Sequence, residues 1–236
     1  MAITLVKFRS GMGVPCPSTF CMKAEILLKM ANLDYESSIL DDPRKSPKGK
    51  FPYIIDDGKE IADSHFIQRY LEQSYDADFD PDLTQQQRAI SHGMARMVEE
   101  RLYWALVYNR WIDEANWRDT AQFWFGTMPP IMRNIVPIVA RRQVRASLHG
   151  HGLGRHNQKD TYGLGAEDIA ALAAHLGDQD YMFGDTPTAL DAIAYPVITN
   201  ILTPPVASPL REAAQQHPLL AAYVTRCTER WFPDFA

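Results

Sequence analysis

Two short segments carry residues whose types and spacing could hold a small acidic peptide. In the first, Phe51 precedes Pro52, and X-Pro bonds are almost the only peptide bonds found in the cis form. A cis bond would turn the backbone N–H and C=O of Phe51 outward, where an extended peptide could pair with them as an added strand. Lys50 stands beside that slot and could pair with a carboxylate. The segment therefore predicts binding through the backbone, with a positive charge nearby.

The second segment is the Asp63-Ser64 pair, which precedes a predicted helix. The residues after it have apolar members at helical spacing, namely Phe66, Ile67, Tyr70 and Leu71. Asp63 or Ser64 is therefore expected at the N-cap, because Asp and Ser are preferred there. The free N–H groups and the dipole at a helix N-terminus favour an anion. We expect a carboxylate of the ligand at this end.

The elements that must position these residues alternate between strands and helices. Residues 3–8, 35–40 and 53–55 are strand-like, and residues 19–31 have helical apolar spacing. Asp57-Gly58 is a strong signal for a two-residue hairpin turn into a short strand at residues 60–61. The Gly- and Pro-rich stretch 9–19 is expected to be a loop before the first helix.

This order of elements resembles the thioredoxin-like N-terminal domain of cytosolic glutathione transferases. The family has a stretch similar to residues 46–52 before its cis-proline and an acidic-Ser pair similar to Asp63-Ser64. The resemblance implies that this pair grips the γ-glutamyl group of glutathione. The usual acid is Glu, so Asp63 reaches one methylene less far. The implied glutathione-binding residues are Phe20, Lys50, Phe51, Pro52, Asp63 and Ser64.

The resemblance also implies a catalytic position at the mouth of the first helix, which falls on Ser18. Its hydroxyl could donate to a bound thiol and, with the helix dipole, stabilise the thiolate, which is the nucleophile. Some branches of the family use a catalytic Cys instead, so a thiol transferase that uses Cys16 remains an alternative. Cys21 is interpreted as a buried small hydrophobe. A C-x-x-C redox pair is excluded because four residues separate the two cysteines.

An acidic stretch that contains proline separates the predicted thioredoxin-like domain, residues 1–76, from an all-helical domain, residues 84–236. Residues 85–111 have the apolar spacing of one long helix. Thr188 and Asp191 have the spacing of a capping box, within a stretch similar to one in the C-terminal domain of glutathione transferases. Tyr108 and Trp111 lie one turn apart near the end of the long helix, where the family opens its cleft. They are the candidates for a second-substrate pocket, which would suit a small apolar electrophile.

Residues 120–159 contain no acidic residue and are therefore positively charged. Within them, residues 152–156 resemble an element of the branch of the family that includes metaxins and the failed-axon-connections proteins. Some members of that branch look like transport or scaffold components, so a non-catalytic partner-binding module that uses this basic segment is the main alternative. Arg155 and His156 could contact an anion. His149, His151 and His156 do not have Cys or carboxylate ligands nearby, so we expect no metal.

Apolar residues beside the arginines, Ile131, Ile135, Ile138 and Val139, could lie on a membrane surface. We do not expect a membrane partner, because three nearby prolines, Pro129, Pro130 and Pro137, should interrupt the helix.

Composition favours a cytoplasmic protein. The 236 residues carry a net charge of −5, which argues against general nucleic-acid binding, and three cysteines, which suggest a reducing compartment. We expect neither a signal peptide nor a membrane-spanning run from this sequence. The resemblance implies a homodimer that binds glutathione as a substrate and catalyses thiolate attack on a small electrophile.

Overall fold

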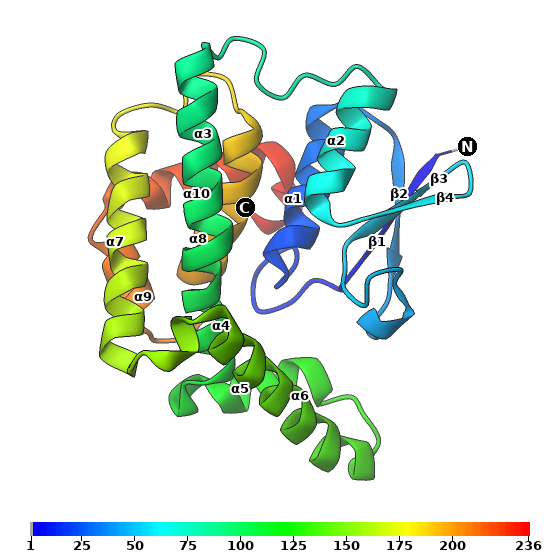
Figure 1. The fold of residues 1–236 in the computed structure, drawn as a ribbon, viewed down its shortest axis with the longest axis vertical. Helices are drawn as coiled ribbons and strands as arrows, with labels where there is room; N and C mark the ends of the chain where they lie inside the picture. Colours follow the sequence, from blue (N-terminus) through cyan, green and yellow to red (C-terminus); the bar gives the residue numbers. More distant parts are fainter. Residues whose placement is uncertain (1) are drawn as a thin grey trace.

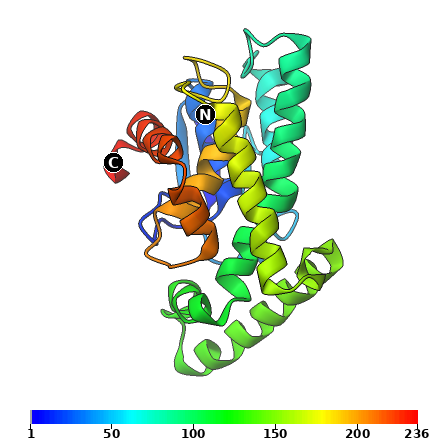
Figure 2. The same cartoon turned by 90° about the vertical axis from the view of Figure 1, so that its left-hand side faces the viewer.

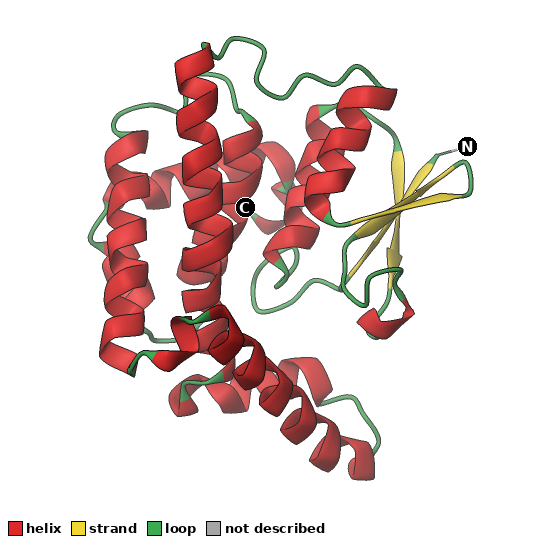
Figure 3. Ribbon diagram, in the orientation of Figure 1, coloured by secondary structure: helices red, strands yellow, loops and turns green. Residues whose placement is uncertain are grey.

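The computed structural model describes residues 2–236. Its first part contains a four-stranded sheet and two α-helices (Figure 3). The elements are β1 (Ile3–Lys7), α1 (Thr19–Met30), β2 (Tyr35–Ile39), a 3-10 turn (Pro43–Lys45), β3 (Tyr53–Asp56), β4 (Lys59–Ala62) and α2 (Ser64–Ser74). Every strand and helix predicted in this part is present, and the bounds that were predicted differ by at most one residue from those observed.

The sheet has the strand order β2-β1-β3-β4. β1 pairs parallel with β2 and antiparallel with β3, and β4 returns antiparallel to β3. The last turn is the predicted hairpin, because Asp57 and Gly58 both adopt positive φ angles, of 46° and 78°. Figure 1 shows α1 and α2 between the sheet and the helices of the second part. This is the thioredoxin-like arrangement expected from the sequence.

The second part of the described chain is helical. It contains α3 (Gln85–Met97), a π-helical segment η2 (Val98–Leu102), α4 (Tyr103–Trp111), α5 (Glu114–Phe125), α6 (Pro130–His151), a 3-10 turn η3 (Leu153–Arg155), α7 (Gln158–Leu176), α8 (Ala189–Leu202), α9 (Pro209–Gln215), α10 (Pro218–Trp231) and a 3-10 turn (Pro233–Phe235). The predicted helix over residues 85–111 is present, but its middle is π-helical. The extra residue in a π turn changes the helical phase, and Glu99 within this segment is buried.

The expectation that prolines interrupt the helix beyond residue 129 is wrong. α6 begins at Pro130 and runs without a break through Pro137 to His151. Pro130 occupies the first turn, where the backbone N–H groups have no partner within the helix, so its missing N–H costs no helical hydrogen bond. Pro137 removes one hydrogen bond in the interior, but its side chain is buried against the neighbouring helices. Figures 1 and 2 both show α5 and α6 at one end of the molecule.

The core of the helical part is α8, which is buried from Ala189 to Ile201 and packs against α1. Its start is the predicted capping box. The carboxylate of Asp191 accepts hydrogen bonds from the backbone N–H groups of Thr188, at 2.7 Å, and Met182, at 2.9 Å. It also accepts one from the Tyr223 hydroxyl at 3.0 Å. Packing of α1 on α8 therefore brings the first helix of the thioredoxin-like part onto the centre of the helical part.

Candidate functional site

Ser18 is the N-cap of α1. Its hydroxyl oxygen accepts a hydrogen bond from the backbone N–H of Cys21 at 3.4 Å, and the residue is half-buried. An N-cap hydroxyl uses its oxygen as an acceptor toward the helix and keeps an O–H group that can donate to sulfur, as the lowered pKa of the neighbouring Cys21 thiol indicates. The positive end of the α1 dipole lies at the same place. This is the geometry that a thiolate-stabilising hydroxyl needs.

The two cysteines that flank Ser18 are buried and free. The Cys16 thiol contacts the Phe8 carbonyl at 3.6 Å. Burial raises the pKa of Cys16, with a further rise from its hydrogen bond to Cys21. Burial also acts to raise the pKa of Cys21, but hydrogen bonds with Cys16 and Ser18 lower it overall. A buried thiol with a raised pKa is a poor nucleophile, which weighs against the thiol-transferase alternative at Cys16.

The loop before α1 is held from the helical part by a buried pair that sequence reasoning missed. Arg110, on α4, donates to the Pro17 carbonyl at 2.8 Å and to the side-chain oxygen of Asn200 at 2.6 Å. Asn200, on α8, in turn donates to the Cys16 carbonyl at 3.2 Å. Burial lowers the pKa of Arg110 to about 10. The sequence did contain a signal for this pair, because Arg110 and Asn200 are polar residues within helical stretches that are otherwise mainly apolar.

The Phe51-Pro52 peptide bond is cis, as predicted. Among the residues that the structure describes, none forms a hydrogen bond with the backbone N–H or C=O of Phe51. The Phe51 ring is buried, and the Phe8 ring meets it edge-on with centroids 4.9 Å apart. Because the ring is held inside, the position of the backbone groups is fixed.

Asp63 is the N-cap of α2 and Ser64 is its first residue. Asp63 has a φ of 85°, a left-handed conformation that is uncommon for a residue other than glycine. Its backbone N–H donates to the Pro52 carbonyl at 3.3 Å, so this pair is tied directly to the cis-proline. Its carboxylate accepts from the N–H of His65 at 2.9 Å. Asp63 is exposed and Ser64 is buried, which leaves the carboxylate accessible at the helix end.

Lys50 has an exposed side chain, while its carbonyl is held by the Ser46 hydroxyl at 2.7 Å. Its ammonium group is therefore available to an anion next to Phe51.

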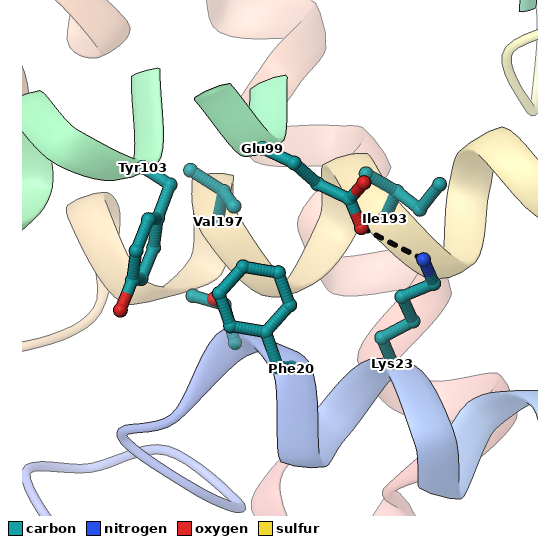
Figure 4. A pocket seen from close by; sticks show the side chains of 7 residues that line it. Phe20, Lys23, Glu99, Tyr103, Ile193 and Val197 are labelled. Atoms are coloured by element: carbon teal, nitrogen blue, oxygen red, sulfur yellow. Dashed lines mark hydrogen bonds and ion pairs between the residues drawn. The ribbon is translucent and has the colours of Figure 1, made fainter. Parts of the chain in front are cut away.

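Phe20 lines a small enclosed space between α1 and the helical part. The other lining residues are Thr19, Lys23, Glu99, Tyr103, Ile193 and Val197. Figure 4 shows the Phe20 ring with the Tyr103 ring on one side and the ion pair between Lys23 and Glu99 on the other. The volume is ≈ 10 Å³, enough for about one water molecule. Phe20 therefore supports the packing of the domains beside Ser18, and this space holds no second substrate.

Tyr108 and Trp111, the candidates for a second-substrate pocket, pack against different helices. The Tyr108 ring meets Tyr162 of α7 edge-on, with centroids 5.8 Å apart. The Trp111 ring packs against Trp117 and Trp124 of α5 at 5.8 and 6.5 Å. Both residues are half-buried.

The remaining candidates lie at the corner between α6 and α7. Arg155 and His156 are exposed, and Arg155 donates to the His149 carbonyl at 3.1 Å, which closes the α6 C-terminus. His151 stacks on Trp104. No group of three or more metal-ligating side chains exists within residues 2–236.

A thioredoxin-like domain with a cis-proline tied to the N-terminus of α2, joined to an all-helical domain, is the arrangement of glutathione transferase folds. Comparison with known proteins supports the same class. The family model of the glutathione S-transferase N-terminal domain matches residues 19–116, and that of the C-terminal domain matches residues 165–227. The chain belongs to the glutathione S-transferase family.

Three curated relatives illustrate the range of the family. "Failed axon connections" from Drosophila melanogaster is 31% identical over 99% of this chain, which spans 59% of that protein's length. Isoprene-epoxide–glutathione S-transferase from Rhodococcus sp. is 30% identical and covers 97% of this chain and 99% of its own. Human Metaxin-1 is 27% identical over 94% of this chain and 50% of its own length.

Among solved structures, beta-etherase LigF from Sphingobium sp. strain SYK-6 matches with a TM-score of 0.69 and 18% identity. The match covers 100% of this chain and 98% of that chain, so the two folds agree throughout. Within the helices that the structure describes, none is long and apolar enough to cross a membrane.

Proposed function

We propose that the protein binds glutathione in an extended form and catalyses attack of its thiolate on a small apolar electrophile. The observation that carries this proposal is the Phe51 backbone, whose N–H and C=O stand beside a cis-proline without a hydrogen-bond partner in the described chain. An added peptide strand would satisfy both groups. The γ-glutamyl carboxylate would then reach the α2 N-terminus at Ser64, and Lys50 would pair with the other end of the tripeptide.

In this proposal Ser18 lowers the pKa of the bound thiol by donating its hydroxyl hydrogen to the sulfur, assisted by the α1 dipole. The side chain does not attack the substrate. Binding supplies orientation, and the hydroxyl supplies electrostatic stabilisation of the thiolate. Phe20 holds the start of α1 against the helical domain.

An epoxide is the electrophile that we propose, because the relative that this chain matches over nearly its whole length is named for an isoprene epoxide. The sulfur would form a bond to a ring carbon, the carbon–oxygen bond would break, and the resulting alkoxide would take a proton from water. We propose that Tyr108 and Trp111 belong to the walls of its cleft. We also propose that the protein forms a homodimer and is located in the cytoplasm.

The test is a calorimetric titration of the whole protein with reduced glutathione, followed by a conjugation assay with a small apolar epoxide. We expect saturable binding that Asp63→Ala weakens and Asp63→Glu preserves, because glutamate keeps the carboxylate at the α2 N-cap. No heat of binding up to millimolar glutathione would contradict the proposal.

A second candidate is a protein that keeps this fold without catalysis. The space beside Phe20 has a volume of only ≈ 10 Å³, which is too small for an electrophile, and "Failed axon connections" is a relative of similar identity. Glutathione binding without turnover of any epoxide would favour this candidate.

A further inference from the structure

The outer face of α6 carries an unpartnered stripe that is apolar in its first half and cationic in its second. Residues 131, 135, 138, 142 and 145 are separated by four, three, four and three positions, and Val139 follows Ile135 by four, which places all six on one side of a helix. We call the outer stripe the set Ile131, Ile135, Ile138, Val139, Arg142 and Arg145. The opposite side of the helix is the one that packs on the protein, through Pro137 and Leu148, both buried.

The apolar half of the outer stripe is strongly exposed. Ile131, Ile135 and Ile138 are 75%, 55% and 69% accessible to solvent, and they lie next to one another over two turns. Scattered exposed hydrophobes are ordinary, whereas a contiguous aliphatic patch marks an interaction surface. Figures 1 and 2 show α6 at the outer edge of the molecule. This face is therefore open to a large planar partner.

Charge identifies the partner. The chain has a net charge of −5, yet residues 120–159 contain no acidic side chain. Arg142 and Arg145 are exposed and continue the stripe, while Arg141 is held inside by the Trp111 carbonyl and by Glu114. A second copy of this chain is disfavoured, because a parallel pair of stripes would set arginine against arginine and an antiparallel pair would set arginine against isoleucine. Neither arrangement supplies a carboxylate.

We propose that the outer stripe of α6 docks on a membrane surface that contains anionic phospholipids. The aliphatic half would enter the boundary between headgroups and acyl chains, while Arg142 and Arg145 would remain at the level of the phosphates. α6 lies within residues 117–164, the stretch between the two segments that the family models match. The inference does not depend on glutathione binding.

Flotation of the full chain with lipid vesicles tests the proposal. We expect the protein to float with vesicles of equimolar phosphatidylcholine and phosphatidylserine, to remain behind with vesicles of phosphatidylcholine alone, and to be released by concentrated salt. Arg142→Ala with Arg145→Ala should weaken binding by about fivefold for each arginine. Ile135→Ser with Ile138→Ser should weaken it by at least as much, since two large apolar groups are removed.

The matched control is Arg69→Ala with Leu219→Ser, which removes an exposed arginine and an exposed aliphatic residue from α2 and α10. It should bind vesicles as the parent does, and circular dichroism should show all variants folded. Absence of flotation, or stripe variants that float as well as the parent, would overturn the proposal. So would a stripe variant that changes the sedimentation coefficient, because it would reassign this face to self-association.

Discussion

The Ser18 hydroxyl caps α1, and in the proposed mechanism the same group donates to the thiol of glutathione. Ser18→Ala should raise the pKa of bound glutathione and lower the conjugation rate by about 10²-fold, the effect of removing one preorganised donor. It should also lower the free energy of unfolding by about 1 kcal/mol through loss of the cap. Ultraviolet absorbance of the thiolate, rate assays and urea denaturation measure the three effects. Ser18→Thr keeps the hydroxyl and serves as the control, and an unchanged thiol pKa in Ser18→Ala would remove Ser18 from the mechanism.

His65 lies in the first turn of α2. Its pKa should respond to the charged groups that surround it. Partial burial lowers its pKa from 6.5, with further lowering by the positive charges of Lys23 and Arg96. The folded protein therefore favours the neutral imidazole, and the unfolded chain binds more protons as the pH falls below about 6.5. The contribution of His65 to stability is thus complete above this pH and is lost as the pH falls toward the lower, folded value.

Proton NMR titration of the imidazole measures the His65 pKa directly. Denaturation at several pH values should show a loss of stability below about pH 6.5 that is smaller in His65→Gln. An imidazole pKa at or above that of a free histidine would contradict the assignment.

At the scale of elements, the loop before α1 depends on two helices of the other domain. Arg110→Met would leave the carbonyls of Pro17 and Asn200 buried without their donor, at a cost of about 2–4 kcal/mol in the free energy of unfolding. The displaced loop should also weaken glutathione binding, because Ser18 follows Pro17. Urea denaturation and calorimetry measure both. Arg118→Met, on the exposed side of α5, is the control. Equal losses of stability and of glutathione affinity in the two variants would show that the contacts of Arg110 do not hold the loop.

The local signals of the thioredoxin-like part were strong enough to predict its elements. A proline, a two-residue turn and an N-cap each act within a few residues, so cis-Pro52, Asp57-Gly58 and Asp63 were all found from the sequence. The proposed ligand, glutathione, came from the family resemblance, because residue spacing alone does not identify a ligand.

The contacts of the helical part were harder to predict, because they depend on tertiary packing. Arg110 meets Pro17 across 93 residues, and no local pattern encodes that distance. Pro137 was expected to interrupt its helix, but the residue is buried and α6 continues through it. Tyr108 and Trp111 lie one turn apart, yet they contact different helices.

For the whole molecule, a buried ion pair between Lys23 and Glu99 joins the two domains. The ammonium of Lys23, on α1, lies 2.7 Å from the Glu99 carboxylate, in the π-helical segment, and both side chains are buried. Burial lowers the pKa of Lys23, and the Glu99 carboxylate partly offsets that change. Glu99→Ala would leave a buried ammonium without its carboxylate, so the free energy of unfolding should fall by about 3–5 kcal/mol. Urea denaturation, followed by circular dichroism, measures the loss.

The double variant Lys23→Met with Glu99→Leu separates charge from packing. It removes both charges and keeps apolar volume, so its stability should return to within about 1 kcal/mol of the parent or exceed it. If the pair serves mainly to fix how the domains dock, the stable double variant should still lose affinity for glutathione, because α1 carries Ser18 at its start. A double variant as unstable as Glu99→Ala would mean that the unpaired ammonium of Lys23 is not the main source of the lost stability.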